Sequence, residues 1–252
     1  MRLLKDLRDW LALRRHLQRP WSFVRTRTRD LPGPWCDVFL RDGGTLRLRT
    51  DTDDRQVFND VFARDEYGVT GLADLDTVID VGAHVGAFSV RVATIARRVL
   101  SYEPFPASHD LLVENTRRFP HVTVFRQAVA GRRAAAPLFI GNDPCNNSLV
   151  RGLAGDSTIT VDAVTLADVF EQHRVDRCDL LKLDVEGAEY DILQGATDDV
   201  LRRVRRIVLE YHPVEGASAE RLAGHLSHSG FRVRLRPRRR RQGKGVLFGV
   251  RG

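Results

Sequence analysis

The sequence predicts an α/β protein built on a doubly wound, mostly parallel sheet. From residue 77 onward, short apolar runs typical of buried strands alternate with segments of helical periodicity, a pattern typical of parallel strands joined by helices. The last two strand-like runs, 231–236 and 246–250, flank a basic connection and indicate a hairpin. A hairpin at the end of such a sheet places one antiparallel strand at or near its edge.

The first part of the chain contains elements of a different kind. Residues 3–17 repeat leucine and tryptophan at helical spacing among charged side chains, which predicts an amphipathic helix. Residues 37–49 contain two short strand-like runs around Asp-Gly-Gly, which is a hairpin signal. Residues 55–67 then indicate a second helix that ends near Tyr67.

These elements divide the chain into an N-terminal helix and β-hairpin extension, residues 1–70, and a main domain, residues 71–252. The N-terminal helix is expected to pack on the main domain, because its leucines need cover. Dimerisation or binding to a membrane surface would cover the same leucines and stay open as alternatives.

In the main domain, apolar β-branched runs predict strands and a 3.6-residue period predicts helices. The expected strands are 77–81, 98–102, 122–128, 180–184 and 206–210, and the expected helices are 87–98, 107–119, 187–193 and 219–229. An inserted strand pair is expected at 134–140 and 157–164, on either side of the polar loop 141–148.

Composition narrows the class of protein. A chain of 252 residues that is 42% hydrophobic can bury a core of one large domain or two small ones. No apolar run approaches the roughly 20 residues that span a bilayer, and no signal-peptide pattern follows the N-terminus. Three scattered cysteines exclude a disulfide framework and a Cys-x-x-Cys metal site. We therefore expect a cytoplasmic protein without a transmembrane segment.

The net charge of +7 is unevenly distributed. Residues 1–29 carry +7 and residues 230–252 carry +9, whereas residues 30–229 carry −9. The run 236–244 is either a solvated hairpin loop or a basic surface that attracts an anionic acceptor. A nucleic-acid partner is less favoured, because no aromatic side chains interleave with these arginines for base stacking.

The first strand of the main domain ends in a glycine-containing turn. Gly82 permits a tight turn and close approach of a ligand, and Gly86 lets the next helix begin close to the sheet. Asp80 precedes this turn and His84 lies in its middle. Glu103, at the end of the second strand, is placed to accept hydrogen bonds from both hydroxyls of a ribose. Together these residues predict a site for an adenine-nucleoside cofactor.

The spacing of the glycines favours a cofactor without phosphates. A dinucleotide site requires bare backbone at the position that His84 occupies. S-adenosylmethionine offers a ribose for Glu103, together with an ammonium and a sulfonium that suit the acidic middle of the chain. We therefore expect S-adenosylmethionine as the cofactor.

Several motifs in order resemble the FkbM family of S-adenosylmethionine-dependent methyltransferases, over roughly residues 35–213. The matching stretches are VIDVGAHVGAFS (78–89), YEPFP (102–106), FRQAVAG (125–131), Ser148-Leu149, ITVDAVTLAD (159–168), LLKLDVEGAEYDILQGA (180–196) and IVLEYHP (207–213). The resemblance implies a class I methyltransferase (Rossmann-like) fold and methyl transfer to oxygen, often on natural products or sugars. It also implies that Gln127 and Ala128 contact the cofactor. His84 departs from the family, in which Asn is commoner.

Three residues are candidates for the base that takes the proton of an acceptor hydroxyl. Asp184 and Glu186 follow the fourth strand, at the edge where open α/β sheets bind ligands, and His212 follows the fifth. Asp184 should also face the cofactor. Capping of the next helix is an equal interpretation for Glu186 and Glu189. Asp184, Glu210 and His212 could alternatively hold a divalent metal ion, which we do not expect because no tight ligand spacing requires it.

The loop 141–148 is either an ordinary surface turn or a polar lid over the acceptor, with Asn147 and Ser148 as substrate contacts. The sequence thus predicts a small-molecule O-methyltransferase. An RNA-modifying methyltransferase and a non-catalytic cofactor-binding protein are the alternatives. The identity of the acceptor and the oligomeric state are left open.

Overall fold

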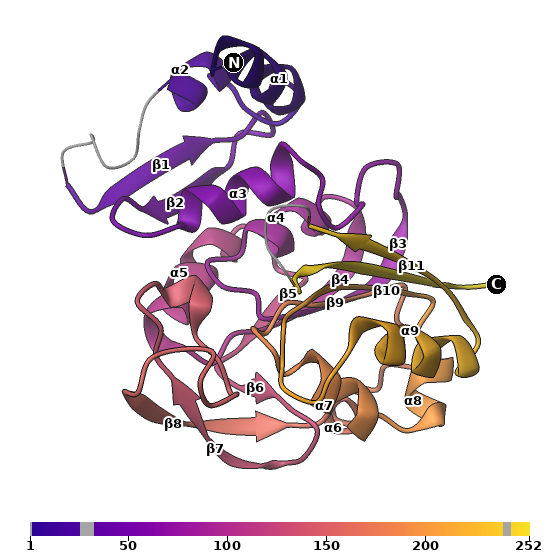
Figure 1. The fold of residues 1–252 in the computed structure, drawn as a ribbon. Helices are drawn as coiled ribbons and strands as arrows, with labels where there is room; N and C mark the ends of the chain where they lie inside the picture. The colour runs from indigo at the N-terminus through magenta and orange to yellow at the C-terminus, as the bar shows by residue number, and fades with distance from the viewer. Residues whose placement is uncertain (1, 26–32, 239–242) are drawn as a thin grey trace.

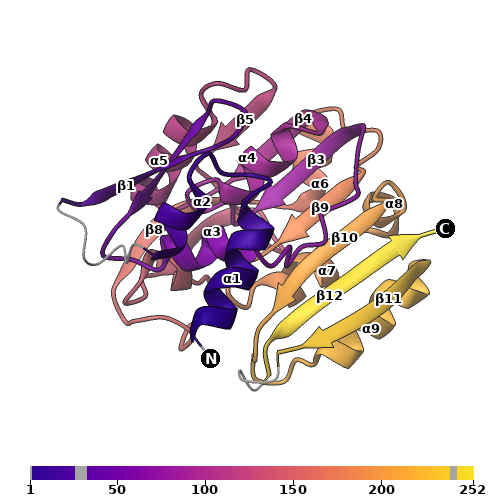
Figure 2. The ribbon, with the colours of Figure 1, turned by 90° about the horizontal axis from the view of Figure 1, so that it is seen from above.

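The computed structural model describes residues 2–25, 33–238 and 243–252. Its centre is a seven-stranded sheet in the order β11-β12-β10-β9-β3-β4-β5, visible strand by strand in Figure 2. The five strands from β10 to β5 are parallel, β12 is antiparallel to β10, and β11 pairs antiparallel with β12. The predicted mostly parallel sheet with a C-terminal hairpin is therefore confirmed.

The elements of the main domain alternate along the chain as expected. The strands of the sheet are β3 (Leu75–Val81), β4 (Ala96–Tyr102), β5 (Val122–Phe125), β9 (Leu180–Leu183), β10 (Arg206–Tyr211), β11 (Phe231–Pro237) and β12 (Gly245–Arg251). The helices are α4 (Ala87–Ala93), α5 (Pro106–Thr116), α6 (Leu166–Gln172), α7 (Glu189–Gly195), α8 (Asp198–Arg202) and α9 (Ala219–His228). Of these, α6 and α8 are short helices that the sequence pattern did not indicate.

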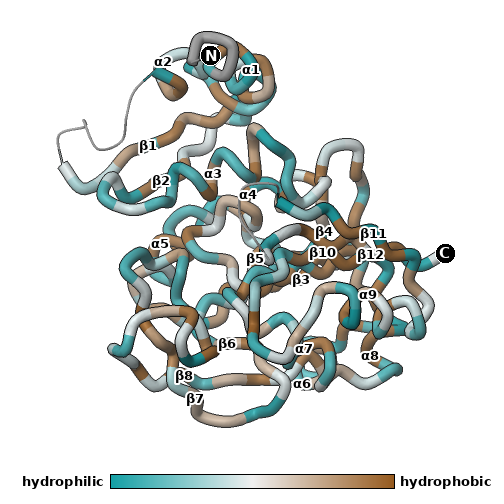
Figure 3. Tube along the Cα trace, in the orientation of Figure 1, coloured by the Kyte–Doolittle hydropathy of each residue, from teal (hydrophilic) through white to brown (hydrophobic). Residues whose placement is uncertain are grey.

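Helices cover both faces of the sheet (Figure 1). Because side chains alternate along a strand, Ile79 and Leu181 belong to the core shared with α6, α7, α8 and α9. Their neighbours Val78 and Leu180 belong to the core on the α4 side. Figure 3 shows the strands as the apolar centre of the molecule, with hydrophilic segments outside.

The N-terminal extension shares a core with the sheet. It contains α1 (Arg2–Leu13), α2 (Pro20–Arg25), the antiparallel pair β1 (Trp35–Phe39) and β2 (Thr45–Arg49), and α3 (Asp54–Phe62). The helix expected at 3–17 ends at Leu13. Leu13 and Leu17, which follows the helix, are buried in the same cluster as Val78 of the sheet, so this end of the helix packs as expected. Leu7 and Leu11, earlier in the helix, stay exposed.

A small second sheet is inserted after β5. It consists of β6 (Ala128–Val129), β7 (Ala134–Phe139) and β8 (Thr158–Val164), in the order β6-β8-β7. The antiparallel pair β7–β8 confirms the predicted strand pair. The single strand expected at 122–128 is wrong, because the chain leaves the main sheet after Phe125 and β6 pairs with β8 instead.

Helix ends differ most from expectation. The helix expected at 87–98 ends at Ala93, because the chain enters β4 at Ala96. The helix expected at 55–67 ends at Phe62, and Asp65 then adopts a positive φ of 49° that no helix continues through. Within the described ranges, no helix has the length and apolar character needed to cross a membrane.

Candidate functional site

The turn after β3 is held against the end of β9. Gly82 has φ +74°, and a Cβ there would overlap the carbonyl oxygen of Asp184. Gly86 has φ +88°, and its Cβ would lie 2.7 Å from Leu112 on α5. Glycine is therefore required twice, once for close strand packing and once for close helix packing. The turn leaves backbone groups facing the carboxyl edge of the sheet.

Glu103 is anchored at the end of β4 by the backbone of two loops. Its two carboxylate oxygens accept hydrogen bonds from the amides of His84 and Phe105, each at 2.9 Å. Burial raises the pKa of Glu103 to about 7, although both amides favour the ionised form. The carboxylate is thus fixed in position and ready for further donors.

His84 occupies a left-handed position, with φ +52°, in the middle of the turn. Its Nε2 lies 2.9 Å from Arg49 Nη2 and 3.3 Å from Asp54 Oδ1, two residues of the N-terminal extension. Burial lowers the pKa of His84 to about 4, so the ring is neutral and accepts from the guanidinium. The N-terminal extension therefore fixes the loop from outside the main domain.

A buried lysine on β9 was missed by sequence reasoning. Lys182 donates to the carbonyl of Gly82 at 2.7 Å and pairs with Asp80 at 3.0 Å. Its ammonium also lies 5.4 Å from the ring of Tyr67, a cation–π distance. Although burial opposes the charge, Asp80 and other carboxylates raise the pKa of Lys182. A lysine inside the apolar run 180–183 is a signal in the sequence, because the chain has only three lysines among its 40 basic residues.

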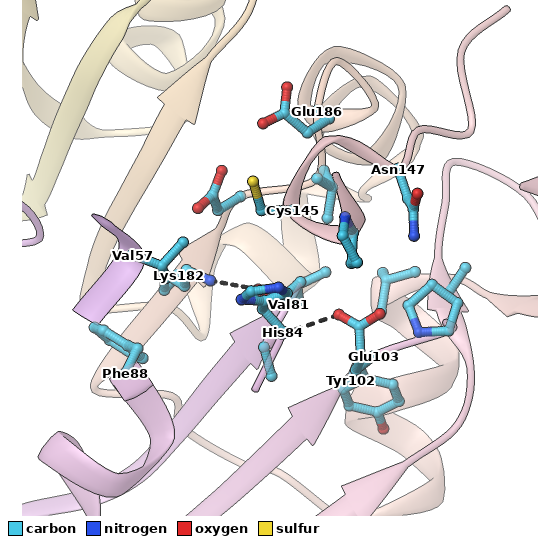
Figure 4. Close-up of a pocket in the computed structure, with 18 of the residues that line it drawn as sticks. Val57, Val81, His84, Phe88, Tyr102, Glu103, Cys145, Asn147, Lys182 and Glu186 are labelled. Carbon is cyan, nitrogen blue, oxygen red and sulfur yellow. Dashed lines mark hydrogen bonds between the residues drawn. The ribbon is translucent and has the colours of Figure 1, made fainter. Parts of the chain in front are cut away.

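These residues surround a cavity of about 790 Å³, which includes space open to solvent. Figure 4 shows Glu103, His84 and Lys182 directed toward it, with Cys145 and Asn147 from the inserted loop on the opposite side. Among the expected cofactor contacts, its lining contains Gly82, His84, Glu103, Gln127, Ala128 and Asp184. Asn147 and Glu186 line it as well. We call it the cofactor cavity.

Four expected site residues lie behind this lining. Asp80 is fully buried between Lys182 and the hydroxyl of Ser89, which donates to it at 2.6 Å. Gly86 packs against α5. Ser148 and His212 are also buried and do not line the cavity. These four residues support the site and do not face the open space.

The inserted loop is fastened over the cavity at two points. Asp143 accepts a hydrogen bond from the amide of Asp53 at 2.7 Å. Ser148 donates its hydroxyl to the carbonyl of Glu186 at 2.6 Å, and its backbone pairs with Phe139. Between these points a 3₁₀ turn, Pro144–Asn146, brings Cys145 to the lining. The loop is therefore a wall of the cavity.

A second cavity of about 1010 Å³, also partly open to solvent, adjoins the first. The two share five lining residues, which include Tyr67, Asp184 and Glu186. The second cavity adds further carboxylates and two cations, and these are Asp53, Asp60, Glu210, Arg238 and Lys244. We call it the acidic cavity. Asp184 and Glu186 are the carboxylates common to both.

Asp184 stands at the boundary of the two cavities. Its Oδ2 accepts a hydrogen bond from the hydroxyl of Tyr67 at 2.6 Å. Burial alone would raise the pKa of Asp184, but the charges of Lys182 and His212 lower it. The carboxylate is therefore ionised at neutral pH. Sequence reasoning could not find this tyrosine contact, because 117 residues separate the partners.

Glu189 and His212 form a buried support beneath Glu186. Glu189 begins α7 and accepts from the amides of Val185 and Gly187, which precede the helix, so its side chain fixes the turn before α7 and does not cap the helix. Its Oε1 also lies 2.9 Å from His212 Nδ1. His212 Nε2 lies 3.1 Å from Glu186 Oε2. Burial lowers the pKa of His212, but Glu189 and Glu186 together raise it to about 10.

Glu210 completes this group of acidic residues. Its Oε2 accepts from Arg238 at 2.8 Å, and the same guanidinium pairs with Glu66. Burial and the nearby charge of Asp184 raise the pKa of Glu210 to about 8. Three ligand atoms lie within 4.8 Å of one another, one from each of Asp184, Glu210 and His212. The structure therefore brings together the three residues considered as metal ligands.

The basic run at 236–244 reaches the acidic cavity at both of its described ends. Arg238 pairs with Glu66 and Glu210, and Lys244 pairs with Glu186 at 3.2 Å. Both charges are thus matched by carboxylates of the site. Residues 239–242, which hold three further arginines of this run, lie outside the described residues.

The chain is similar to several known methyltransferases. The sequence model described as Methyltransferase FkbM domain matches residues 80–233. The chain is 28% identical over 261 residues to the AMB antimetabolite synthetase AmbE of Pseudomonas aeruginosa, covering 85% of this chain and 12% of that protein. It is 29% identical over 191 residues to the 31-O-demethyl-FK506 methyltransferase FkbM of Streptomyces tacrolimicus, covering 63% of this chain and 73% of that one.

A third relative is the hexuronic acid methyltransferase AglP of Haloferax volcanii, 26% identical over 137 residues, covering 54% of this chain and 56% of that protein. Among solved structures, the methyltransferase FkbM of Methylobacillus flagellatus superposes with a TM-score of 0.52 at 14% identity. That match covers 98% of this chain and 60% of the other. At this identity the likeness concerns the fold, which is that of a class I methyltransferase.

Proposed function

The chain belongs to the FkbM methyltransferase family, and from this premise we propose that it transfers a methyl group from S-adenosylmethionine to a hydroxyl of a small organic acceptor. One observation carries the proposal: the cofactor cavity and the acidic cavity meet at Asp184 and Glu186. A methyl donor in the first cavity and a hydroxyl in the second would face each other there. The relatives named for a hexuronic acid and for 31-O-demethyl-FK506 support a small, hydroxylated acceptor.

In the cofactor cavity, Glu103 would accept hydrogen bonds from the two ribose hydroxyls, because its carboxylate is already oriented by backbone amides. Gln127 and Ala128, which line the same cavity, would lie beside the base. Asp184 would face the ammonium and the methyl-bearing sulfonium. When bound, S-adenosylmethionine supplies an electrophilic methyl carbon.

The acceptor hydroxyl must lose a proton as its oxygen attacks the methyl carbon. Asp184 and Glu186 are the two expected bases that line both cavities. His212 is 1% exposed and lines neither of them, so we propose that it acts behind Glu186. The enzyme's other contribution is alignment of the two reactants. The cytoplasmic location and the anionic character of the acceptor stay predictions.

The test combines isotopically labelled S-adenosylmethionine with a panel of sugars and hydroxylated natural products, read by mass spectrometry. We expect Asp184→Asn or Glu186→Gln to lower kcat by about 100-fold, and Glu186→Gln to change cofactor affinity little. Glu103→Ala should weaken cofactor binding by about 1–3 kcal/mol, measured by calorimetry. Glu220→Gln, on the exposed side of α9, is the matched control. Full turnover in both Asp184→Asn and Glu186→Gln would remove these carboxylates from the mechanism.

A further inference from the structure

We propose that Asp184, Glu210 and His212 bind a divalent metal ion at the boundary of the two cavities. The three side chains come from the ends of the neighbouring strands β9 and β10. One ligand atom of each lies within 4.8 Å of the others. Two carboxylate oxygens and one imidazole nitrogen form a donor set that divalent cations accept. The role given to the ion below rests on the proposed methyl transfer, whereas binding itself does not.

The two carboxylates are each held by one oxygen and leave the other available. Tyr67 donates to Oδ2 of Asp184 at 2.6 Å. Arg238 donates to Oε2 of Glu210 at 2.8 Å. Each hydrogen bond fixes the carboxyl group without using its second oxygen. This is the arrangement expected of pre-oriented monodentate ligands, which lose little freedom when an ion binds.

His212 supplies an independent observation. Its Nδ1 lies 2.9 Å from Oε1 of Glu189, which fixes the ring. Its Nε2 is buried and makes no hydrogen bond to the part of the chain that the structure describes. Glu186 Oε2 lies 3.1 Å from Nε2, but without the alignment of a hydrogen bond. A metal ion at Nε2 would take the place of the proton that the charged ring carries there, and a carboxylate on the other ring nitrogen is the usual support of a metal-bound histidine.

The distances need little adjustment. Metal–ligand bonds of about 2.1 Å place neighbouring donor atoms about 3–4 Å apart. His212 Nε2 and Glu210 Oε1 are already 3.6 Å apart. Because Asp184 and Glu210 line the acidic cavity, the remaining coordination positions of the ion would open toward the acceptor.

The charge around this point also favours a cation. Asp184, Glu186 and Glu210 lie within the same wall, and Asp53 and Asp60 line the same cavity. Among the described residues of that lining, Arg238 and Lys244 are the basic side chains, and each already pairs with a carboxylate. A divalent ion would offset the carboxylates that these two leave unmatched. The imidazole favours Mn²⁺ over Mg²⁺.

The ion would bind the acceptor oxygen and make its proton easier to remove. Glu186 then remains beside the ion as the carboxylate that takes this proton. The oxygen forms a bond to the methyl carbon as the carbon–sulfur bond breaks, and that bond's electron pair stays on sulfur. An ion with two open positions would select acceptors with neighbouring oxygens, such as a 1,2-diol or an α-hydroxy acid.

The experiment is a titration of the metal-free full-length chain with Mn²⁺ alone, followed by electron paramagnetic resonance. We expect one Mn²⁺ per chain, with affinity at least tenfold weaker in Glu210→Gln and His212→Asn. Glu220→Gln removes an exposed carboxylate of α9 that lines neither cavity, and this variant should bind like the parent chain. Circular dichroism and thermal melting of each variant show whether it is folded. Should a cluster variant fail to fold, Asp184→Asn in the same titration replaces it.

The outcomes separate the two proposals. Absence of stoichiometric Mn²⁺ binding, or binding unchanged in all the cluster variants, overturns the metal site. Methyl transfer that persists in full with EDTA and metal-free protein also overturns the ion's role, but it leaves the proposed function standing. Stoichiometric binding without methyl transfer to any acceptor supports the site and contradicts the function.

Discussion

At Glu103, two backbone amides hold the carboxylate in place while burial raises its pKa to about 7. In the proposed complex, the ribose hydroxyls add two donors and no new charge. Hydrogen bonds to the ionised form stabilise it. Cofactor binding should therefore lower this pKa, and the free protein below about pH 7 should bind more protons than the complex.

The sign of the pH effect follows. At about pH 6, cofactor binding should release a proton from Glu103, and affinity should rise with pH up to about 7 and then level. Calorimetry in two buffers of different ionisation enthalpy measures the proton released. In Glu103→Gln the affinity should be lower and the pH dependence absent. An affinity that stays constant from about pH 5 to 8 in the parent chain would contradict this assignment.

At this scale, the sequence supported some site residues better than others. Glu103, Gly82 and Asp184 follow strand ends, so their place at the carboxyl edge was predictable from the strand pattern alone. Tyr67 was not found, because it contacts Asp184 across 117 residues. Lys182 was not found, because it lies inside an apolar run that indicates an ordinary buried strand. Asp80 was expected to contact the cofactor, yet its partner is Lys182.

At the scale of elements, the inserted loop depends on Ser148. Its buried hydroxyl donates to the carbonyl of Glu186 and accepts from the amide of Val150 at 2.9 Å. Glu186 itself has a φ of +49°, a conformation that needs support from its surroundings. One hydroxyl thus holds both the loop and the backbone of a proposed base.

Ser148→Ala should therefore destabilise the fold by about 1–3 kcal/mol, because two partly buried backbone groups lose their partner. Urea unfolding at constant m-value measures the loss. Ser157→Ala, an exposed position at the other end of the same insertion, should change stability by less than about 0.5 kcal/mol. Equal unfolding free energies for the two variants would show that Ser148 does not fasten the loop.

The strand order was largely predictable and the element ends were not. Strands alternating with helices restrict the chain to a parallel sheet, and the terminal hairpin adds its antiparallel strand. The separation of β5 from β6 depends on pairing with β8, more than 25 residues further along, which no local pattern records. Short helices such as α8, whose five residues are capped by Thr197, carry too few apolar positions to show a period.

At the scale of the whole molecule, the extension and the sheet share one core. Leu13 of α1 is fully buried in the cluster that contains Val78 and Val208 of the sheet. Arg49 and Asp54 of the extension also fix His84 in the turn after β3. Unfolding of the extension should therefore be cooperative with unfolding of the sheet and with loss of the site.

Leu13→Ala should cost about 2–5 kcal/mol of stability, seen as a lower Tm in calorimetry. Leu11→Ala, in the same helix and 43% exposed, should leave Tm nearly unchanged. Unfolding followed by circular dichroism and loss of the site followed by release of a fluorescent cofactor analogue should have the same midpoint temperature in both variants. Two separate transitions would mean that the extension folds independently.

The cofactor cavity is complete with side chains up to residue 186, whereas the acidic cavity also needs Glu210, Arg238 and Lys244. In the proposed function, the last strands of the sheet thus supply residues to the acceptor side and none to the lining of the donor side. Over evolutionary time, substitutions in the terminal hairpin can exchange one acceptor for another without the cofactor site being rebuilt. A single donor-binding framework can in this way be inherited intact by enzymes that modify quite different molecules.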